Sequence, residues 1–191
     1  MSTRYILASR SPRRKELLSL IVDSFEVITS DFDESRITAP DPEQLVKRLS
    51  GCKAKAVAEA QDGLVIGADT VVVSPEGRVF GIPQDREEAK RMLSLLSGRR
   101  HQVMTGVTLI DGVYEDCFCV KTDVFFRSIE PEEIDAYIET GEPFDKAGGY
   151  GIQGKASVFV EKVEGDYFNV VGLPVSAVYL AIKKWKKTKN S

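Results

Sequence analysis

The sequence predicts a mixed α/β fold in which strands and helices alternate along the chain. Apolar, β-branched segments such as residues 64–73 alternate with capped helical segments such as residues 41–60. Two long strands are expected at residues 101–110 and 113–126, and the Asp-Gly pair between them is typical of a tight hairpin. Because a hairpin makes its two strands antiparallel, the sheet is not expected to be a purely parallel, doubly wound one.

The remaining elements follow from capping residues and from the spacing of apolar residues. Ser11 before Pro12 indicates a helix start, and Asp41 and Asp85 are each followed three residues later by a Gln or Glu that can complete a capping box. A glycine-rich loop is expected at residues 141–155. Further strands are expected at residues 5–8, 25–29, 78–80, 158–163 and 168–171, and further helices at residues 131–140 and 174–187.

Composition and charge exclude several classes of protein. The 191 residues are 42% hydrophobic and 29% charged, which is the balance of a globular protein with a packed core. No apolar run approaches the roughly 20 residues that span a bilayer, and the N-terminal apolar stretch is too short for a signal peptide, so we expect a cytoplasmic protein. The net charge of −3 does not suggest nucleic acid as a partner, and the lysines within residues 183–189 suit the end of a helix.

The cysteines and the single histidine offer little chemistry by themselves. Cys52, Cys117 and Cys119 are an odd set with no histidine cluster beside them, so we expect reduced, partly buried thiols and neither a disulfide framework nor a zinc site. His101 begins a strand and has no evident cysteine or serine partner. A structural or surface role is therefore expected for it.

The first candidate segment for function, residues 7–14 (LASRSPRR), runs from a strand into a helix start. Free backbone N–H groups at a helix start, together with arginines, make a site for a phosphate chain. Arginines at this end oppose the helix dipole, and a bound anion would relieve that cost. The alternative is that these arginines simply lie on the surface.

Asp69 lies in the motif GADT of residues 67–70, inside an apolar strand. A carboxylate there is costly unless it is ion-paired, hydrogen-bonded or bound to a metal, so Asp69 is the best single functional candidate on physical grounds. The alternative is an aspartate that is satisfied by nearby backbone. The Asp-x-Asp spacing of aspartyl-phosphate phosphatases is absent from the sequence.

Two further segments add polar groups. Asp33 and Glu34 are a carboxylate pair that could help to hold a hard cation such as Mg²⁺, although acidic pairs are common in loops. Residues 140–154 end in a stretch with four glycines that would let the backbone approach a ligand, while Lys146 adds charge and Gln153 adds an amide. The segment has neither the Walker order nor the dinucleotide-binding order of residues, and a plain loop is the alternative.

Together these segments resemble the Maf family in their order and spacing, over nearly the whole chain. Any one motif is modest, but the ordered set is specific. The matching segments are SRSPRR at residues 9–14, GADT at 67–70, LSG at 96–98 with His101 and TGV at 105–107, DKAGGYGIQG at 145–154, and GDY at 165–167 with VGLP at 171–174.

The resemblance implies a fold like that of the inosine-triphosphate pyrophosphatases: a single domain over residues 1–191, with a mixed central sheet in two lobes and a cleft between them. It implies an enzyme that uses Mg²⁺ or Mn²⁺ to hydrolyse nucleoside triphosphates to the monophosphate and pyrophosphate, and often a homodimer. DT at residues 69–70 and YGIQ at 150–153 resemble the branch that acts on dTTP and UTP. CTP and modified pyrimidine nucleotides stay open as substrates. The implied cellular role is the removal of unwanted nucleotides.

The resemblance also implies roles for individual residues. Asp69 matches the catalytic base, and Glu34 and Lys53 match an acidic residue and a lysine near the site, so these three are the expected catalytic residues. Glu34 and Asp69 would also bind the metal. By the chemistry of its amide, Gln153 can accept from the N3–H of uracil or thymine and donate to O4, and a flipped amide can pair with cytosine as well. Base selection is expected to depend on Arg13, Thr70 and Gln153. The full set of expected substrate-binding residues is Ser9, Arg13, Arg14, Thr70, Lys146 and Gln153.

The chain departs from the family pattern at one position. Residues 81–83 read Gly-Ile-Pro, where the family typically has a central lysine that would contact phosphate. Ile82 cannot make that contact, and the loss of a charge-assisted bond of roughly 1.5–3 kcal/mol predicts weaker triphosphate binding or slower turnover. The rival hypothesis is therefore a nucleotide-binding regulator of septum formation with little catalysis. A nucleic-acid-binding protein is a more distant third.

Overall fold

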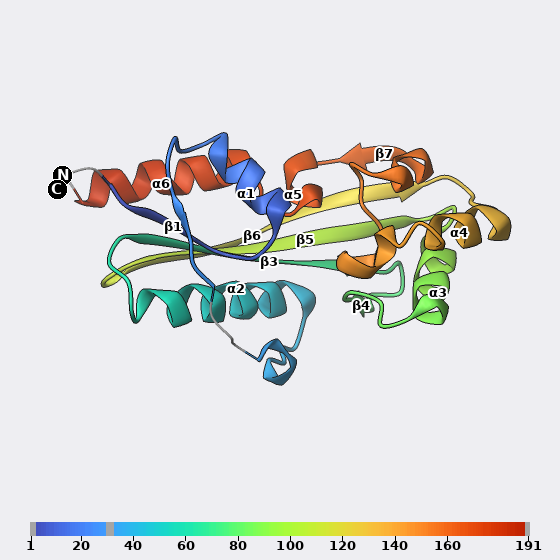
Figure 1. Cartoon of the computed structure of the whole chain (residues 1–191), viewed down its shortest axis with the longest axis horizontal. Coiled ribbons are helices and arrows are strands. Elements are labelled where there is room, and N and C mark those ends of the chain that lie inside the picture. The colour runs from blue at the N-terminus through green and yellow to red at the C-terminus, as the bar shows by residue number, and fades with distance from the viewer. Residues whose placement is uncertain (1–2, 30–32, 190–191) are drawn as a thin grey trace. The chain divides into compact units, whose positions relative to one another are not determined.

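The computed structural model describes residues 3–29 and 33–189, and the chain divides into two compact units. Unit 1 comprises Met1–Asp69, Thr105–Val120 and Gly172–Ser191, and unit 2 comprises Thr70–Met104 and Lys121–Val171. Three long strands contribute residues to both units (Figure 1). They are β3 (Leu64–Val73), β5 (Arg100–Asp111) and β6 (Tyr114–Phe126).

Unit 1 is built on short parallel strands beside β3. β1 (Tyr5–Ala8) pairs in parallel with β2 (Glu26–Val27) and with β3, which places Ala8 opposite Gly67. The helical elements of the unit are α1 (Pro12–Ser19), the 3₁₀ turn η1 (Glu34–Arg36), α2 (Pro42–Ala58) and α6 (Val175–Lys189). One buried cluster joins α2 to the strands through Ile6, Ala8, Ala54, Val57, Val65 and Ile110.

Two glycines of unit 1 bring α2 against the strands at main-chain distance. A Cβ atom on Gly67 would lie 2.4 Å from the carbonyl oxygen of Ser50, and a Cβ atom on Gly106 would lie 2.3 Å from that of Val46. A side chain fits at neither position, so the main chain of α2 rests directly on β3 and β5. This main-chain contact determines where the side chains of α2 lie.

Unit 2 combines antiparallel strands with short helices. β4 (Val79–Phe80) pairs antiparallel with β3, and β7 (Val160–Glu164) pairs antiparallel with β6. The helices are α3 (Arg86–Leu96), α4 (Pro131–Ile138) and α5 (Tyr167–Val171), with 3₁₀ turns η2 (Glu142–Asp145), η3 (Ala147–Gly149) and η4 (Lys155–Phe159). The core of the unit contains edge-to-face contacts among the aromatic rings of Phe126, Tyr137, Tyr150 and Phe159.

The strands form one mixed sheet in the order β2-β1-β3-β5-β6-β7, with β4 beside β3. Only residues 112 and 113 separate β5 from β6, and Gly112 has a φ of 58°, as the predicted hairpin requires. The predicted mixed α/β class is confirmed. Across residues 3–29 and 33–189, no helix is long and apolar enough to cross a membrane.

The predicted helix starts are confirmed, but one predicted strand is wrong. Each predicted cap accepts a hydrogen bond from the backbone N–H three residues later; the caps are Ser11, Asp41 and Asp85. Residues 168–171 form part of α5 and not a strand. Their aromatic and β-branched side chains suggested a strand, but the Asp166 carboxylate accepts from the N–H groups of Phe168 and Asn169 and so caps a helix there.

Two other predicted strands are shorter than expected. The strand predicted at residues 25–29 is reduced to Glu26–Val27, and the one predicted at 158–163 begins only at Val160 because η4 occupies the residues before it. The three cysteines are free thiols. Cys117 is exposed and not partly buried as expected.

Candidate active site

A polar cluster in unit 1 is centred on the ammonium group of Lys53. Lys53 Nζ, on α2, donates to Asp69 Oδ1 of β3 at 2.6 Å and lies 3.0 Å from Glu34 Oε1 of η1. Asp69 is only 8% exposed, whereas about half of the Glu34 side chain is accessible to solvent. One cation therefore joins two carboxylates from different elements, and the structure brings together the three residues predicted to be catalytic.

The geometry of β3 and α2 explains why Asp69 meets Lys53. Residues two apart on a strand point to the same face, so Asp69 lies on the face of β3 that carries Gly67. Gly67 is the position where α2 touches the strand, through the main chain of Ser50 and Ala54. The Asp69 carboxylate is thus directed toward α2, where Lys53 follows Ser50 by less than one helical turn.

The surroundings of Asp69 favour a proton acceptor. Burial raises the pKa of the Asp69 carboxyl, and the charges of Lys53 and Arg14 offset part of that rise. Glu34 adds a smaller effect that raises the pKa again. A carboxylate with a raised pKa is a better general base, so this position suits proton transfer.

The start of α1 holds a guanidinium group beside this cluster. Arg14 Nε donates to the carbonyl oxygen of Gly172 at 2.9 Å, and Arg14 Nη1 donates to Ser9 Oγ at 3.2 Å. Ser9 Oγ also accepts from the backbone N–H of Ser11 at 3.2 Å. Burial lowers the pKa of Arg14, and the charge of Asp69 acts in the opposite direction. Fixed positive charge therefore lies at a helix start, as predicted, with Arg13 half-buried on the same turn.

Three of the predicted substrate-binding residues belong to unit 2. Thr70 is half-buried on β3, and Gln153 is exposed in the glycine-rich loop. Lys146 Nζ donates to the carbonyl oxygen of Glu142 at 2.9 Å and forms an ion pair with Asp145. The predicted set is thus divided between the two units, with the acid-base candidates in unit 1 and the loop candidates in unit 2.

The glycines of this loop make room for side chains of the protein itself. A Cβ atom on Gly151 would lie 2.5 Å from Lys146 Cε, and one on Gly154 would lie 2.0 Å from Glu142 Oε1. Gly148 has a φ of 71°, a conformation that other residues rarely adopt. Packing against Lys146 and Glu142 therefore gives Gly151 and Gly154 a structural reason besides the predicted approach of a ligand to the backbone.

His101 is buried beside the same loop. It is 2% exposed, and its Nε2 lies 2.7 Å from Tyr150 Oη. The imidazole also meets the rings of Tyr150 and Phe126 edge to face. Burial lowers the pKa of His101 to about 4. A structural role is thus confirmed, with a partner 49 residues away that no local pattern could have indicated.

The donor atoms of the cluster fit a hard divalent cation. Within residues 3–29 and 33–189, no group of three or more Asp, Glu, His or Cys side chains is placed to hold a metal ion. Glu34 and Asp69 nevertheless direct two carboxylates at one cationic group, the Lys53 ammonium. Mg²⁺ typically takes one or two protein carboxylates and completes its shell with water and substrate phosphates. The residues present therefore suit a cation that arrives with a nucleotide.

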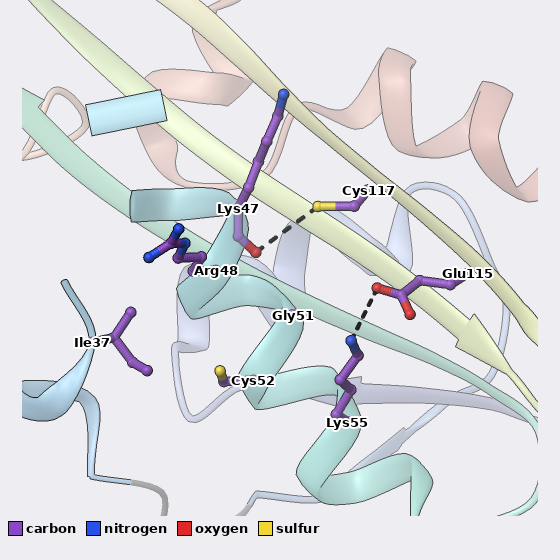
Figure 2. Close-up of a pocket in the computed structure, with 8 residues that line it drawn as sticks. All are labelled: Ile37, Lys47, Arg48, Gly51, Cys52, Lys55, Glu115 and Cys117. Atoms are coloured by element: carbon purple, nitrogen blue, oxygen red, sulfur yellow. Dashed lines mark hydrogen bonds and ion pairs between the residues drawn. The ribbon is translucent and has the colours of Figure 1, made fainter. Parts of the chain in front are cut away.

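A separate pocket of about 340 Å³ lies along α2 in unit 1 (Figure 2). Two of its cations are paired: Lys55 lies 3.3 Å from Glu115, and Lys47 lies 2.6 Å from Glu43. Its lining comprises Ile37, Lys47, Arg48, Gly51, Cys52, Lys55, Glu115 and Cys117. That set includes none of the predicted site residues, so the pocket is not part of the candidate active site.

Comparison with known proteins agrees with the sequence motifs. Residues 4–185 match the family model described as Maf-like protein. A dTTP/UTP pyrophosphatase of Geobacillus sp. (strain WCH70) is 51% identical over 94% of this chain and 96% of its own. A dTTP/UTP pyrophosphatase of Carboxydothermus hydrogenoformans is 50% identical over 94% of this chain and 97% of its own.

The fold is also similar to that of a solved structure, over nearly the whole chain. A HAM1 protein from Coxiella burnetii aligns with a TM-score of 0.54 and 11% identity, and the alignment covers 96% of this chain and 100% of that one. At this identity the likeness bears on the fold alone, and it agrees with the mixed sheet and helices described above.

Proposed function

The chain belongs to the Maf family, and from that premise we propose that it is a pyrophosphatase acting on dTTP and UTP. Two relatives that are about half identical to it over nearly their full length carry that name. Within the molecule, the observation that carries the proposal is the Lys53 ammonium joined to both Asp69 and Glu34. A buried carboxylate whose pKa is raised can accept a proton, and the Lys53 ammonium holds it in position.

In the proposed reaction, water attacks the α-phosphorus of the nucleotide. Asp69 orients that water and accepts its proton, while Lys53 fixes the orientation of the carboxylate through the 2.6 Å hydrogen bond. A new bond forms between the water oxygen and the α-phosphorus. The bond from the α-phosphorus to the oxygen that bridges to the β-phosphorus breaks, and pyrophosphate leaves with that electron pair.

The phosphate chain would be held at the start of α1. Arg14 is already oriented by Ser9 and by the Gly172 carbonyl, so little side-chain entropy is lost when it meets an anion. Arg13 and the backbone N–H groups of the helix start add further donors. Lys146 of the glycine-rich loop remains a predicted substrate-binding residue.

A divalent cation, Mg²⁺ or Mn²⁺, belongs to this proposal. Glu34 and Asp69 would hold it. When bound, the cation supplies positive charge that offsets the charge developing on the phosphate oxygens.

Base selection is assigned to Gln153, Thr70 and Arg13. The exposed amide of Gln153 would accept from N3–H and donate to O4 of uracil or thymine, and a purine presents a different edge. We further propose that the enzyme works on the cytoplasmic nucleotide pool as a homodimer.

The experiment that tests the proposal measures pyrophosphate release from each common ribo- and deoxyribonucleoside triphosphate, with Mg²⁺, with Mn²⁺ and with a chelator. We expect metal-dependent release from dTTP and UTP and little release from purine nucleotides. Release that persists in chelator would contradict the cation assignment. Equal release from all triphosphates would contradict the base assignment.

A nucleotide-binding regulator of cell division is the second candidate, and Ile82 is the observation that favours it. Its side chain is 53% exposed and offers no charge to a phosphate. Nucleotide binding without pyrophosphate release from any triphosphate would place the regulator first. If the Ile82→Lys variant then releases pyrophosphate, the absence of a lysine at position 82 explains why the parent does not.

A further inference from the structure

The side chain of Glu142 joins the two ends of the glycine-rich loop. Its Oε1 accepts from Tyr137 Oη of α4 at 3.1 Å, and its Oε2 accepts from the backbone N–H of Lys155, 13 residues later, at 3.0 Å. The half-buried carboxylate thus uses both oxygens to connect the last turn of α4 to the first residue of η4.

The loop is shaped to receive this carboxylate. A Cβ atom on Gly154 would lie 2.0 Å from Glu142 Oε1 and 2.5 Å from its Cδ, so Gly154 leaves the space that Glu142 fills. The same relation is repeated nearby, because the side chain of Lys146 occupies the space beside Gly151 while its Nζ donates to the Glu142 carbonyl. The Glu142 side chain therefore lies against Gly154, and Lys146, which donates to the Glu142 carbonyl, lies against Gly151, so residues 152 and 153 have a contact on either side.

Gln153 lies between these two glycines, immediately before Gly154. Its side chain is exposed, whereas its neighbour Ile152 is buried. The backbone on either side of Gln153 fixes where its side chain leaves the main chain. That backbone depends on the contacts of Glu142 with Gly154 and Lys155.

From this arrangement we infer that Glu142 is a positioning residue that sets the selectivity for the base through the backbone around Gln153. The inference rests on the proposed function and deepens it, since it names what holds the base-reading loop. Burial and the Glu142 charge both raise the pKa of Tyr137, so its hydroxyl stays protonated and keeps donating to the carboxylate at neutral pH.

The test compares Glu142→Ala with Glu142→Gln, which keeps one of the two acceptor oxygens, and with Tyr137→Phe, which removes one donor without leaving a cavity. In Glu142→Ala we expect the KM for dTTP to rise about tenfold and kcat to change much less, because binding geometry and not the reacting centre is altered. The ratio of kcat/KM for dTTP to that for dGTP should fall with it. The other two variants should lie between this variant and the parent.

Gly154→Ala supplies a second, independent measurement. The added methyl group should act like Glu142→Ala in the parent protein, because it displaces the carboxylate. In a protein that already carries Glu142→Ala the space is free, so the two effects should not add. Glu161→Ala, which removes an exposed carboxylate from β7, is the matched control and should leave KM and the base ratio unchanged.

Several outcomes would overturn the inference. Unchanged KM and base ratio in Glu142→Ala would do so, and so would additive effects of the two substitutions. If Glu142→Ala does not fold, Glu142→Gln and Tyr137→Phe carry the same test, and unchanged base ratios in both would overturn the inference. If the parent releases no pyrophosphate, the proposed function fails separately, and the ratio is read from calorimetric binding of dTTP and dGTP to the same variants.

Discussion

The polar residues of unit 1 and those of unit 2 are held in place by different means. Asp69 and Lys53 lie on a strand and a helix whose main chains touch, and their ion pair is buried. Gln153 and Lys146 lie among 3₁₀ turns that are held by side-chain contacts, such as those of the Glu142 carboxylate with Tyr137 and with the backbone of Lys155. Regular elements give the more precise placement, and loops tolerate change more readily. We therefore expect bond breaking to depend on Asp69 and Lys53 of unit 1, and the amide contact with the base to depend on Gln153 of unit 2.

The largest effect is expected from a substitution of Asp69, and it tests directly whether bond breaking depends on unit 1. Asp69→Asn keeps the shape of the side chain and removes the proton acceptor, so we expect kcat for dTTP to fall by about 10²–10⁴-fold. Because Asp69 is also a proposed ligand of the cation, dTTP binding is compared in chelator, where we expect little change. Pyrophosphate release and calorimetric dTTP binding measure the two quantities. Asp23→Asn, at an exposed carboxylate of the same unit, is the control. A variant that retains most of its turnover would remove the catalytic role from unit 1.

The next effect concerns the buried histidine of unit 2. The pKa of His101 is about 4 in the folded protein and about 6.5 in an unfolded chain, so only the unfolded state binds the proton between these values. The stabilisation by neutral His101 is fully present above pH 6.5 and is lost as the pH falls toward 4, by up to about 3 kcal/mol. Urea unfolding of the parent and of His101→Gln, at neutral pH and at about pH 4.5, measures it. Equal losses in both proteins would show that another group titrates.

The smallest of the three effects tests the contact between α2 and β3. Gly67→Ala would place a methyl group 2.4 Å from the Ser50 carbonyl oxygen, so α2 must move and carry Lys53 with it. We expect a loss of about 1–3 kcal/mol in the free energy of unfolding and a lower kcat. Gly81→Ala is the matched control, because no atom lies within 4 Å of its added Cβ. A Gly67→Ala protein with higher KM and unchanged kcat would contradict the division of roles between the units.

The sequence predicts best where a local signal determines the structure. The caps at Ser11, Asp41 and Asp85 gave helix starts that the structure reproduces, because a cap acts over three residues. Asp69 stood out because a carboxylate inside an apolar strand has a cost that needs an explanation. Residues 168–171 were misassigned, because the side chain of Asp166 outweighed the strand preference of the residues after it.

Contacts between distant segments could not be predicted from these patterns. The pairing of Lys53 with Asp69 depends on how α2 packs on β3, and only the family resemblance pointed to it. Glu142 stood in the candidate loop without an assigned role, since nothing local distinguishes it from an exposed glutamate. Its partner Tyr137 lies in α4 and its partner Lys155 begins η4, and only the folded chain brings both to the carboxylate.

The seating of α2 on two glycines also limits how this protein can diverge. The contact at Gly67 and Gly106 is made by main-chain atoms, which are the same whichever amino acids a lineage substitutes in the helix. Substitutions elsewhere in α2 are therefore expected to leave the spacing between α2 and the strands unchanged, as long as both glycines are kept. The glycine-rich loop differs, because its contact is made by the Glu142 carboxylate and Gly154, which can be exchanged together. New preferences for the base are therefore expected to arise in this loop, and the placement of Asp69 and Lys53 is expected to change less.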